Sequence, residues 1–228
     1  MISVLITGFG PFPGAPFNPT GALARRLARL RHPALADTRR AAHVFTVGYA
    51  AVDRDLPRLI AEHRPQVLLM FGLAARTRHV RIETRARNAR ASFPDANGKR
   101  PPRRSIVAGA PHRPMPIPAV PLVVAARQIR VPVRLSRDAG AYLCNYLCWR
   151  ALDQMKGQDG PLIAFVHVPK LALAPRRATH PRRVTAADLE RIGARILIRL
   201  AAIARRRAIQ EARKRAIGNA RQPVTDRR

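Results

Sequence analysis

The chain has 228 residues, 47% of them hydrophobic, so it can bury a sizeable core, and no break in its composition calls for a second domain. Its longest apolar runs, such as residues 67–73, are about seven residues long against the ~20 that span a bilayer, which excludes a transmembrane helix. The opening MISVLITGFG lacks a basic segment and a cleavage site of small residues. It therefore predicts a buried strand rather than a signal peptide, and we expect a cytoplasmic protein that does not bind membranes.

The charge is strongly basic, with 43 Lys and Arg against 13 Asp and Glu and a formal net charge of +30. Such a charge attracts polyanions through counterion release, so weak, nonspecific and salt-sensitive binding of nucleic acid is expected. Aromatic residues make up only 5% of the chain and the arginines are scattered, so neither a base-stacking sheet nor a recognition helix stands out. Solvated basic faces are the simpler interpretation of the charge.

Apolar runs typical of strands alternate with segments of helical periodicity, in chain order. The first strand is followed by a helix for which Asn18 supplies the N-cap and Pro19 the first residue. A continuous apolar run at 66–72 is typical of the interior of a parallel sheet. Strands are predicted at 2–8, 43–47, 66–72, 78–87, 131–136 and 161–168, and further helices at 51–63, after Asp138 and at about 185–216.

These elements predict an α/β fold, a three-layer α/β/α sandwich with a mostly parallel, twisted sheet in a single domain. Eight prolines fall between Ser92 and Pro121, so residues 92–121 are expected to form an irregular surface excursion. We assign residues 1–203 to the α/β domain. Residues 204–228 are expected to be the basic end of the last helix, a stop at Gly218 and Asn219, and a mobile tail.

Two cysteines, Cys144 and Cys148, lie four residues apart on one predicted helix, where a disulfide framework or a zinc site has no support. We expect reduced thiols, no metal and no cofactor. With Asp138 as N-cap, Cys144 falls within the first two turns, where the helix end lowers the pKa of a thiol. Cys148 lies one turn deeper and is expected to be a core residue, and a lone helical cysteine is more often buried filler than a nucleophile.

A histidine near the end of a strand favours the nucleophile over buried filler as the role of Cys144. His167 follows Leu, Ile, Ala, Phe and Val, and reactive groups in open parallel sheets gather at the carboxyl ends of strands. Glu83 is one of few carboxylates in the chain, and an ion pair with Arg81 or Arg85 is its alternative role. Together, Cys144, His167 and Glu83 would provide a thiolate, a general acid and base, and a group that orients the imidazole.

Four segments resemble the pyroglutamyl peptidase I family in order and spacing. They are LITGFGPFPGAPFNPT (5–20), FGLAARTRHVRIETRARN (71–88), DAGAYLCNYLCWRALD (138–153) and AFVHVP (164–169), and the match covers most of residues 1–200. The resemblance implies a cysteine peptidase that removes an N-terminal pyroglutamate through a thioester. It implies Cys144 as nucleophile, His167 as acid and base, and Glu83 as the group that orients His167.

The same resemblance implies a substrate pocket for the flat pyrrolidone ring. Anchoring of the loop that contains Phe9 and Phe12 is an alternative role for those two side chains. Asn18 is favoured as a cap over a substrate ligand. The residues that match pocket positions are Phe9, Phe12, Thr46, Leu73, Tyr142 and Leu143.

The sequence also departs from the family pattern. Leu73 stands where a glutamine is usual, and Ser92 stands where the family has an arginine near the reacting centre, with Arg90 two positions earlier. Residues 75–77 replace a Gly-Gly-Arg motif with Ala75, Arg76 and Thr77. These changes bear on substrate recognition more than on the nucleophile, and they favour a divergent member of the family.

The expected partner is a peptide with a blocked N-terminus, and the sequence leaves a homo-oligomer open. Two alternatives remain at this point. An inactive binding module on the same scaffold gives little reason to retain cysteine, histidine and glutamate together. A protein that binds nucleic acid accounts for the charge but not for the four motifs.

Overall fold

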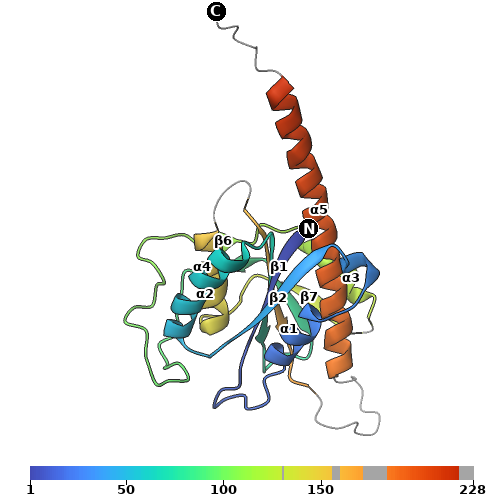
Figure 1. Cartoon of the computed structure of the whole chain (residues 1–228). Helices are drawn as coiled ribbons and strands as arrows, with labels where there is room; N and C mark the ends of the chain where they lie inside the picture. Colours follow the sequence, from blue (N-terminus) through green and yellow to red (C-terminus); the bar gives the residue numbers. More distant parts are fainter. Residues whose placement is uncertain (130, 156–159, 172–183, 221–228) are drawn as a thin grey trace, which may run out of the picture.

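The computed structural model describes residues 1–129, 131–155, 160–171 and 184–220, the last four of them as backbone only. A six-stranded sheet forms its centre (Figure 1). The strands of this sheet are β1 (Ile2–Phe9), β2 (Thr38–Phe45), β3 (Val67–Leu73), β4 (Val80–Glu83), β7 (Val133–Ser136) and β8 (Leu162–Val168). The helices are α1 (Thr20–Ala28), α2 (Tyr49–His63), α3 (Ala119–Arg127), α4 (Leu143–Gln154) and α5 (Ala186–Ala220), with a 3₁₀ turn at Pro33–Leu35 and a small ladder of β5 (Arg85–Ala86) and β6 (Arg113–Pro114).

The strand order is β2-β1-β3-β8-β4-β7. Four strands, β2, β1, β3 and β8, run parallel, and β4 runs antiparallel to β8 and parallel to β7. Because β4 is reversed, Arg81 pairs with His167 near the carboxyl end of β8. Paired residues share a face of the sheet, and so do residues two apart, so Arg81, Glu83 and His167 all lie on one face.

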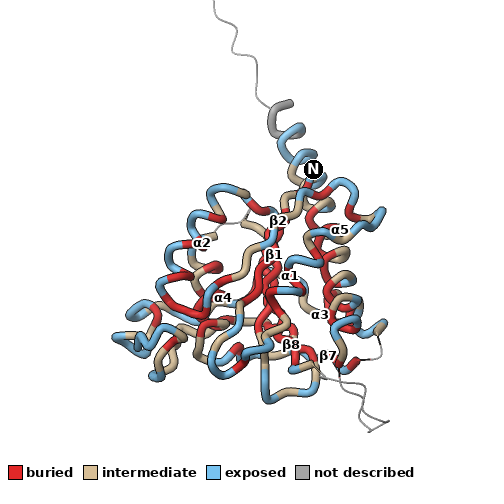
Figure 2. Tube along the Cα trace, turned by 60° about the horizontal axis from the view of Figure 1, so that its bottom comes forward, coloured by how far each residue is buried: buried red, intermediate tan, exposed pale blue. Residues whose placement is uncertain are grey.

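Helices cover both faces, and the mostly parallel three-layer sandwich expected from the sequence is confirmed. One buried cluster joins the sheet to α1, α3 and α5, and the other joins it to α2 and α4. Figure 2 shows the central strands as a buried spine with exposed residues on the outer sides of the helices. None of the described helices is both long and apolar enough to cross a membrane.

Several element boundaries differ from those expected. The alternating segment 78–87 is divided by Thr84 into β4 and β5. The predicted helix stop at Gly218 and Asn219 is wrong, because α5 continues through both residues to Ala220. The predicted boundary at 203/204 falls inside that helix, and the predicted mobile tail from residue 221 lies outside the described residues.

The predicted N-cap of the first helix is also displaced by one residue. Pro19 occupies the N-cap position of α1, and Asn18 lies just before it. The Asn18 side chain nevertheless accepts a hydrogen bond from the Thr20 N–H (3.1 Å) and donates one to the Gly10 carbonyl (3.0 Å). Asn18 thus ties the loop after β1 to the start of α1, as its polar side chain and position before a helix favour.

Candidate active site

Helix α4 presents Cys144 at its amino-terminal end. The N-cap is Tyr142 and the helix begins at Leu143, so Cys144 is its second residue. The expectation that Asp138 caps this helix is wrong. The Asp138 carboxylate instead accepts a hydrogen bond from the Gly140 N–H (2.9 Å), and Gly140 turns the chain with φ +81° before the helix starts. The thiol therefore lies even closer to the helix end than the sequence indicated.

The Cys144 sulfur lies directly against the backbone of β3. A Cβ atom placed on Gly72 would be 2.7 Å from the Cys144 sulfur and 2.8 Å from the Phe165 ring. Gly72 is also the residue of β3 that pairs with His167 of β8. The missing side chain at Gly72 therefore makes the space in which the thiol lies beside the histidine strand.

His167 and Glu83 form a buried hydrogen-bonded pair. The His167 Nδ1 and the Glu83 Oε1 are 2.7 Å apart, and the two residues are 3% and 0% exposed. An ionised carboxylate only accepts hydrogen bonds, so the pairing places the proton on Nδ1 and leaves Nε2 as the basic nitrogen. Glu83 thus fixes both the orientation and the tautomer of the imidazole.

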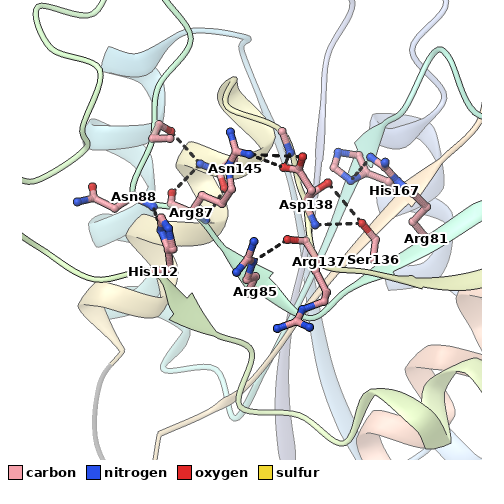
Figure 3. A network of polar contacts seen from close by, with 12 residues as sticks. Arg81, Arg85, Arg87, Asn88, His112, Ser136, Arg137, Asp138, Asn145 and His167 are labelled. Carbon is pink, nitrogen blue, oxygen red and sulfur yellow. Dashed lines mark hydrogen bonds and ion pairs between the residues drawn. The ribbon is translucent and has the colours of Figure 1, made fainter.

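Arg81 contacts both members of this pair. From the sequence, Arg81 was considered only as an alternative ion-pair partner of Glu83. Its guanidinium lies 3.4 Å from the Glu83 Oε1 and 3.4 Å from the His167 Nδ1. Figure 3 shows Arg81 and His167 next to one another, while Arg85 turns away and donates to the Arg137 carbonyl (2.8 Å). The alternating pattern of residues 78–87 could have indicated this contact. Arg81 and Glu83 are two residues apart in a strand, so their side chains lie on the same face of the sheet.

Burial is the largest cause of the pKa shifts of Cys144 and His167. It raises the pKa of the Cys144 thiol to about 12, with a further rise from Glu83, although Arg81 and the backbone N–H groups of Leu73 and Cys144 lower it. Burial also lowers the pKa of His167, against the opposing effect of Glu83. The backbone at the helix end lowers the pKa of the thiol, as the sequence predicts, but burial outweighs this effect and the net shift is upward. Both groups are neutral near pH 7, because desolvation penalises each charged form.

Cys148 occupies a different environment from Cys144. Its side chain is 0% exposed, and its sulfur lies 3.8 Å from the Met115 sulfur in the cluster between α2, α4 and the sheet. Burial and the charge of Glu83 raise its pKa well above the usual value. A thiol in such surroundings is inert toward polar reagents.

The residues expected to line a substrate pocket come from four segments of the chain, one of which is the start of α4 with Tyr142 and Leu143. Phe9 and Phe12 belong to β1 and the loop that follows it, Thr46 follows β2, and Leu73 ends β3. Tyr142 donates a hydrogen bond to the Pro94 carbonyl (3.3 Å), and its ring lies 4.9 Å from that of Phe93. Phe9 and Leu143 are buried, Phe12, Leu73 and Tyr142 are partly buried, and Thr46 is exposed.

Asn145 is a structural residue of this region that the sequence analysis did not single out. Its buried amide accepts a hydrogen bond from the Arg87 N–H (2.8 Å) and donates to the carbonyls of Arg87 (2.8 Å) and Ala89 (2.9 Å). Figure 3 shows Asn145 of α4 beside Arg87, in the segment that leads into the excursion. Its place directly after Cys144, in the segment 138–153 that resembles the family, was the available signal.

A cavity of about 330 Å³ lies beside this contact, lined in part by Arg87, Ser92, Arg104 and Ala141. Arg90 also lines it, but its guanidinium donates to the carbonyls of Ser105 and Ile106 at 3.0 Å. Arg90 is therefore held by the excursion itself. Ser92, which stands at the usual arginine position, is exposed.

This chain is similar to known proteins over most of its length. A model of the pyroglutamyl peptidase family matches residues 2–206. The chain belongs to this family. It is 31% identical to the pyrrolidone-carboxylate peptidase of Pyrococcus furiosus over 171 residues, which cover 74% of this chain and 81% of the relative. It is 33% identical to that of Thermococcus litoralis over 172 residues, covering 74% and 77%.

Solved structures agree with this assignment. The pyrrolidone carboxyl peptidase of Thermus thermophilus superposes with a TM-score of 0.72 at 29% identity, covering 86% of this chain and 99% of that one. A mutant pyrrolidone carboxyl peptidase from P. furiosus gives a TM-score of 0.74 at 28% identity, covering 86% of this chain and 97% of that one. The pyroglutamyl peptidase I of Bacillus amyloliquefaciens, at 22% identity and a TM-score of 0.76, shares the fold. This family member thus has the family's fold over nearly all of its described residues.

Proposed function

We propose that this protein is a cysteine peptidase that hydrolyses an N-terminal pyroglutamyl group from peptides. The observation that carries the proposal is the buried His167–Glu83 hydrogen bond of 2.7 Å next to the strand residue, Gly72, on which the Cys144 sulfur packs. A nucleophile, a base and a group that orients the base are the parts required for acyl transfer through a covalent intermediate. Membership of the family supports the pyroglutamyl group as the acyl part.

In the proposed reaction His167 acts first as a base. The neutral imidazole takes the Cys144 proton on Nε2 while the sulfur attacks the pyroglutamyl carbonyl, so the thiolate forms only as the bond to carbon forms. The imidazolium then protonates the departing amine as the carbon–nitrogen bond breaks. Water attacks the resulting thioester with His167 again as base, which releases pyroglutamate and restores the thiol.

This order of events accounts for the high pKa of the Cys144 thiol. A free thiolate would be costly to bury, whereas transfer to His167 in the transition state avoids a separate charged state. Glu83 stabilises the transient imidazolium, because it raises the pKa of His167 through its hydrogen bond and its charge. Two backbone N–H groups, that of Cys144 at the start of α4 and that of Leu73 at the end of β3, would stabilise the oxyanion.

The proposed pocket for the pyrrolidone ring is apolar. Phe9, Phe12, Leu73, Tyr142 and Leu143 supply aromatic and aliphatic surface around a small uncharged lactam, with Thr46 at the exposed side. A ring without a free amine needs no buried carboxylate to receive it, which separates this substrate from an ordinary amino-terminal residue. The changes at Leu73, Ser92 and residues 75–77 are expected to alter substrate recognition more than the nucleophile.

The test is the release of a fluorophore by the purified protein from pyroglutamyl amide, compared with prolyl and glutamyl amides. The proposal predicts a kcat/KM for the pyroglutamyl amide that exceeds the other two by at least ~100-fold, since an apolar pocket accepts the uncharged ring and leaves the charged amine of the other two without a partner. Equal rates on the prolyl amide would contradict the proposed acyl group. No turnover of any of the three, in a folded protein, would favour the inactive binding module.

A further inference from the structure

Helix α5 carries a line of arginines that the proposed peptidase reaction does not use. Arg195, Arg199, Arg206 and Arg213 follow one another at separations of four, seven and seven residues. With 3.6 residues per turn, these separations place all four within an arc of about 40° around the helix. Three of the four are exposed and Arg199 is partly buried. We call these four residues the arginine stripe.

The stripe is long and borne by a rigid element. Residues 195 and 213 are about 27 Å apart along a helix that rises 1.5 Å per residue. Figure 1 shows that the carboxyl-terminal part of α5 extends past the sheet and the other helices, and Figure 2 shows that part as mainly exposed. The first half of α5 is anchored, because Ile192, Ile196 and Leu200 are buried against the sheet layer. The stripe is therefore both accessible and fixed in direction.

Two of the carboxylates near the stripe are already engaged elsewhere. Glu190 pairs with Arg26 of α1, and Asp37 pairs with Arg205. The adjacent helix α3, with the sequence AVPLVVAAR, has no acidic residue. Within the described part of the chain, no ion pair involves an arginine of the stripe. The four guanidinium groups thus present their charge to solvent rather than to the protein.

The chemistry of the stripe favours a phosphate backbone over a lipid surface. A helix that lies on a membrane buries an apolar face rich in Leu, Phe or Trp in the lipid. The apolar face of α5 is instead packed on the sheet, and beyond Ala204 its one large exposed apolar side chain among the described residues is Ile209. Planar guanidinium groups bind phosphate oxygens through paired hydrogen bonds, and a duplex repeats its phosphates every 3.4 Å along each strand.

We propose that the arginine stripe binds the phosphate backbone of double-stranded nucleic acid. No aromatic side chain lies between its arginines, where residues 196–212 read ILIRLAAIARRRAIQEA, so the site has nothing on which to stack bases. Binding is accordingly independent of base sequence and driven by counterion release. The site is separate from Cys144 and acts whether or not the peptidase reaction takes place.

The test measures binding of a fluorescent 20-base-pair duplex by anisotropy as a function of salt. The stripe variant changes Arg195, Arg199, Arg206 and Arg213 to Gln, which keeps helix propensity. We expect its slope of log K against log salt to be less steep by about 3.6, and its Kd at 100 mM salt to be at least ~10-fold higher. Hydrolysis of pyroglutamyl amide and the circular dichroism spectrum serve as controls for folding and are expected to be unchanged.

A matched control removes the same charge from other surfaces. Arg54, Arg58, Arg100 and Arg103 are exposed and lie on α2 and the excursion, away from α5. Their replacement by Gln is expected to change the slope by less than one. Equal weakening by both variants would show attraction by net charge alone and would overturn the site. Stripe-dependent binding to vesicles of phosphatidylglycerol, without binding to the duplex, would overturn nucleic acid as the partner.

Discussion

Replacement of Gly72 by alanine tests the position of the nucleophile. The new Cβ would lie 2.7 Å from the Cys144 sulfur and 2.8 Å from the Phe165 ring, whereas atoms in contact are ordinarily 3.5–4.0 Å apart. The sulfur must therefore move by about 1 Å. A displacement of that size costs on the order of 100-fold in rate, and overpacking costs about 1–3 kcal/mol in the free energy of unfolding.

The assay is kcat/KM on pyroglutamyl amide together with the midpoint of urea unfolding. Gly193→Ala is the matched control, because its Cβ would lie at the same 2.7 Å from a side chain, Leu27 of α1, far from the thiol. We expect both variants to lose stability and only Gly72→Ala to lose about 100-fold in kcat/KM. A folded Gly72→Ala protein with activity within threefold of the parent would refute the packing of the thiol on β3.

Cys144→Ser is expected to abolish hydrolysis while Cys148→Ser retains most of it, and equal loss in the two would contradict the assignment. His167→Ala is expected to lower kcat/KM by about 10²–10⁴, and Glu83→Gln by less, because an imidazole without its partner still accepts a proton. Arg81 lowers the pKa of His167 and Glu83 raises it, so in kcat/KM profiles Arg81→Met is expected to move the acid limb to higher pH and Glu83→Gln to lower pH. If both variants moved the acid limb in the same direction, the limb would not report the ionisation of His167.

His167 also makes the free energy of unfolding depend on pH, with lower stability at lower pH. Burial lowers the pKa of His167 in the folded protein below its usual value of about 6.5, so the unfolded chain binds the extra proton first as the pH falls. The contribution of neutral His167 is present above pH ~6.5 and is lost as the pH falls below it. Urea unfolding at pH 8 and pH 5.5 is expected to show a smaller difference for His167→Gln than for the parent protein. An unchanged difference would exclude this linkage.

Much of the fold could be predicted because its strands have strong local patterns. The run 66–72 is apolar on both sides, as a strand buried between two helical layers requires, and it differs from β3 (Val67–Leu73) by one residue at each end. The reversal of β4 could not be predicted, since periodicity specifies a strand but not its direction. That reversal places Arg81 opposite His167 and so decides the electrostatics of the site.

The environment of the thiol was the least predictable feature. A carboxylate a few residues before a helical pattern is a standard start signal, but Gly140 with its positive φ delays the helix to Leu143. The closeness of Cys144 to the helix end indicated a lowered pKa. Burial against Gly72 and Phe165 reversed that direction, and such a tertiary contact leaves no mark in the local sequence.

The most direct test of the proposed function is labelling with a pyroglutamyl chloromethyl ketone, which reacts only where a pocket for the ring and a nucleophile lie together. We expect one label per chain, found by peptide mapping on Cys144, with loss of activity in proportion to labelling and protection by pyroglutamyl peptide. Labelling of Cys148, or complete loss of activity with Cys144 unmodified, would contradict it.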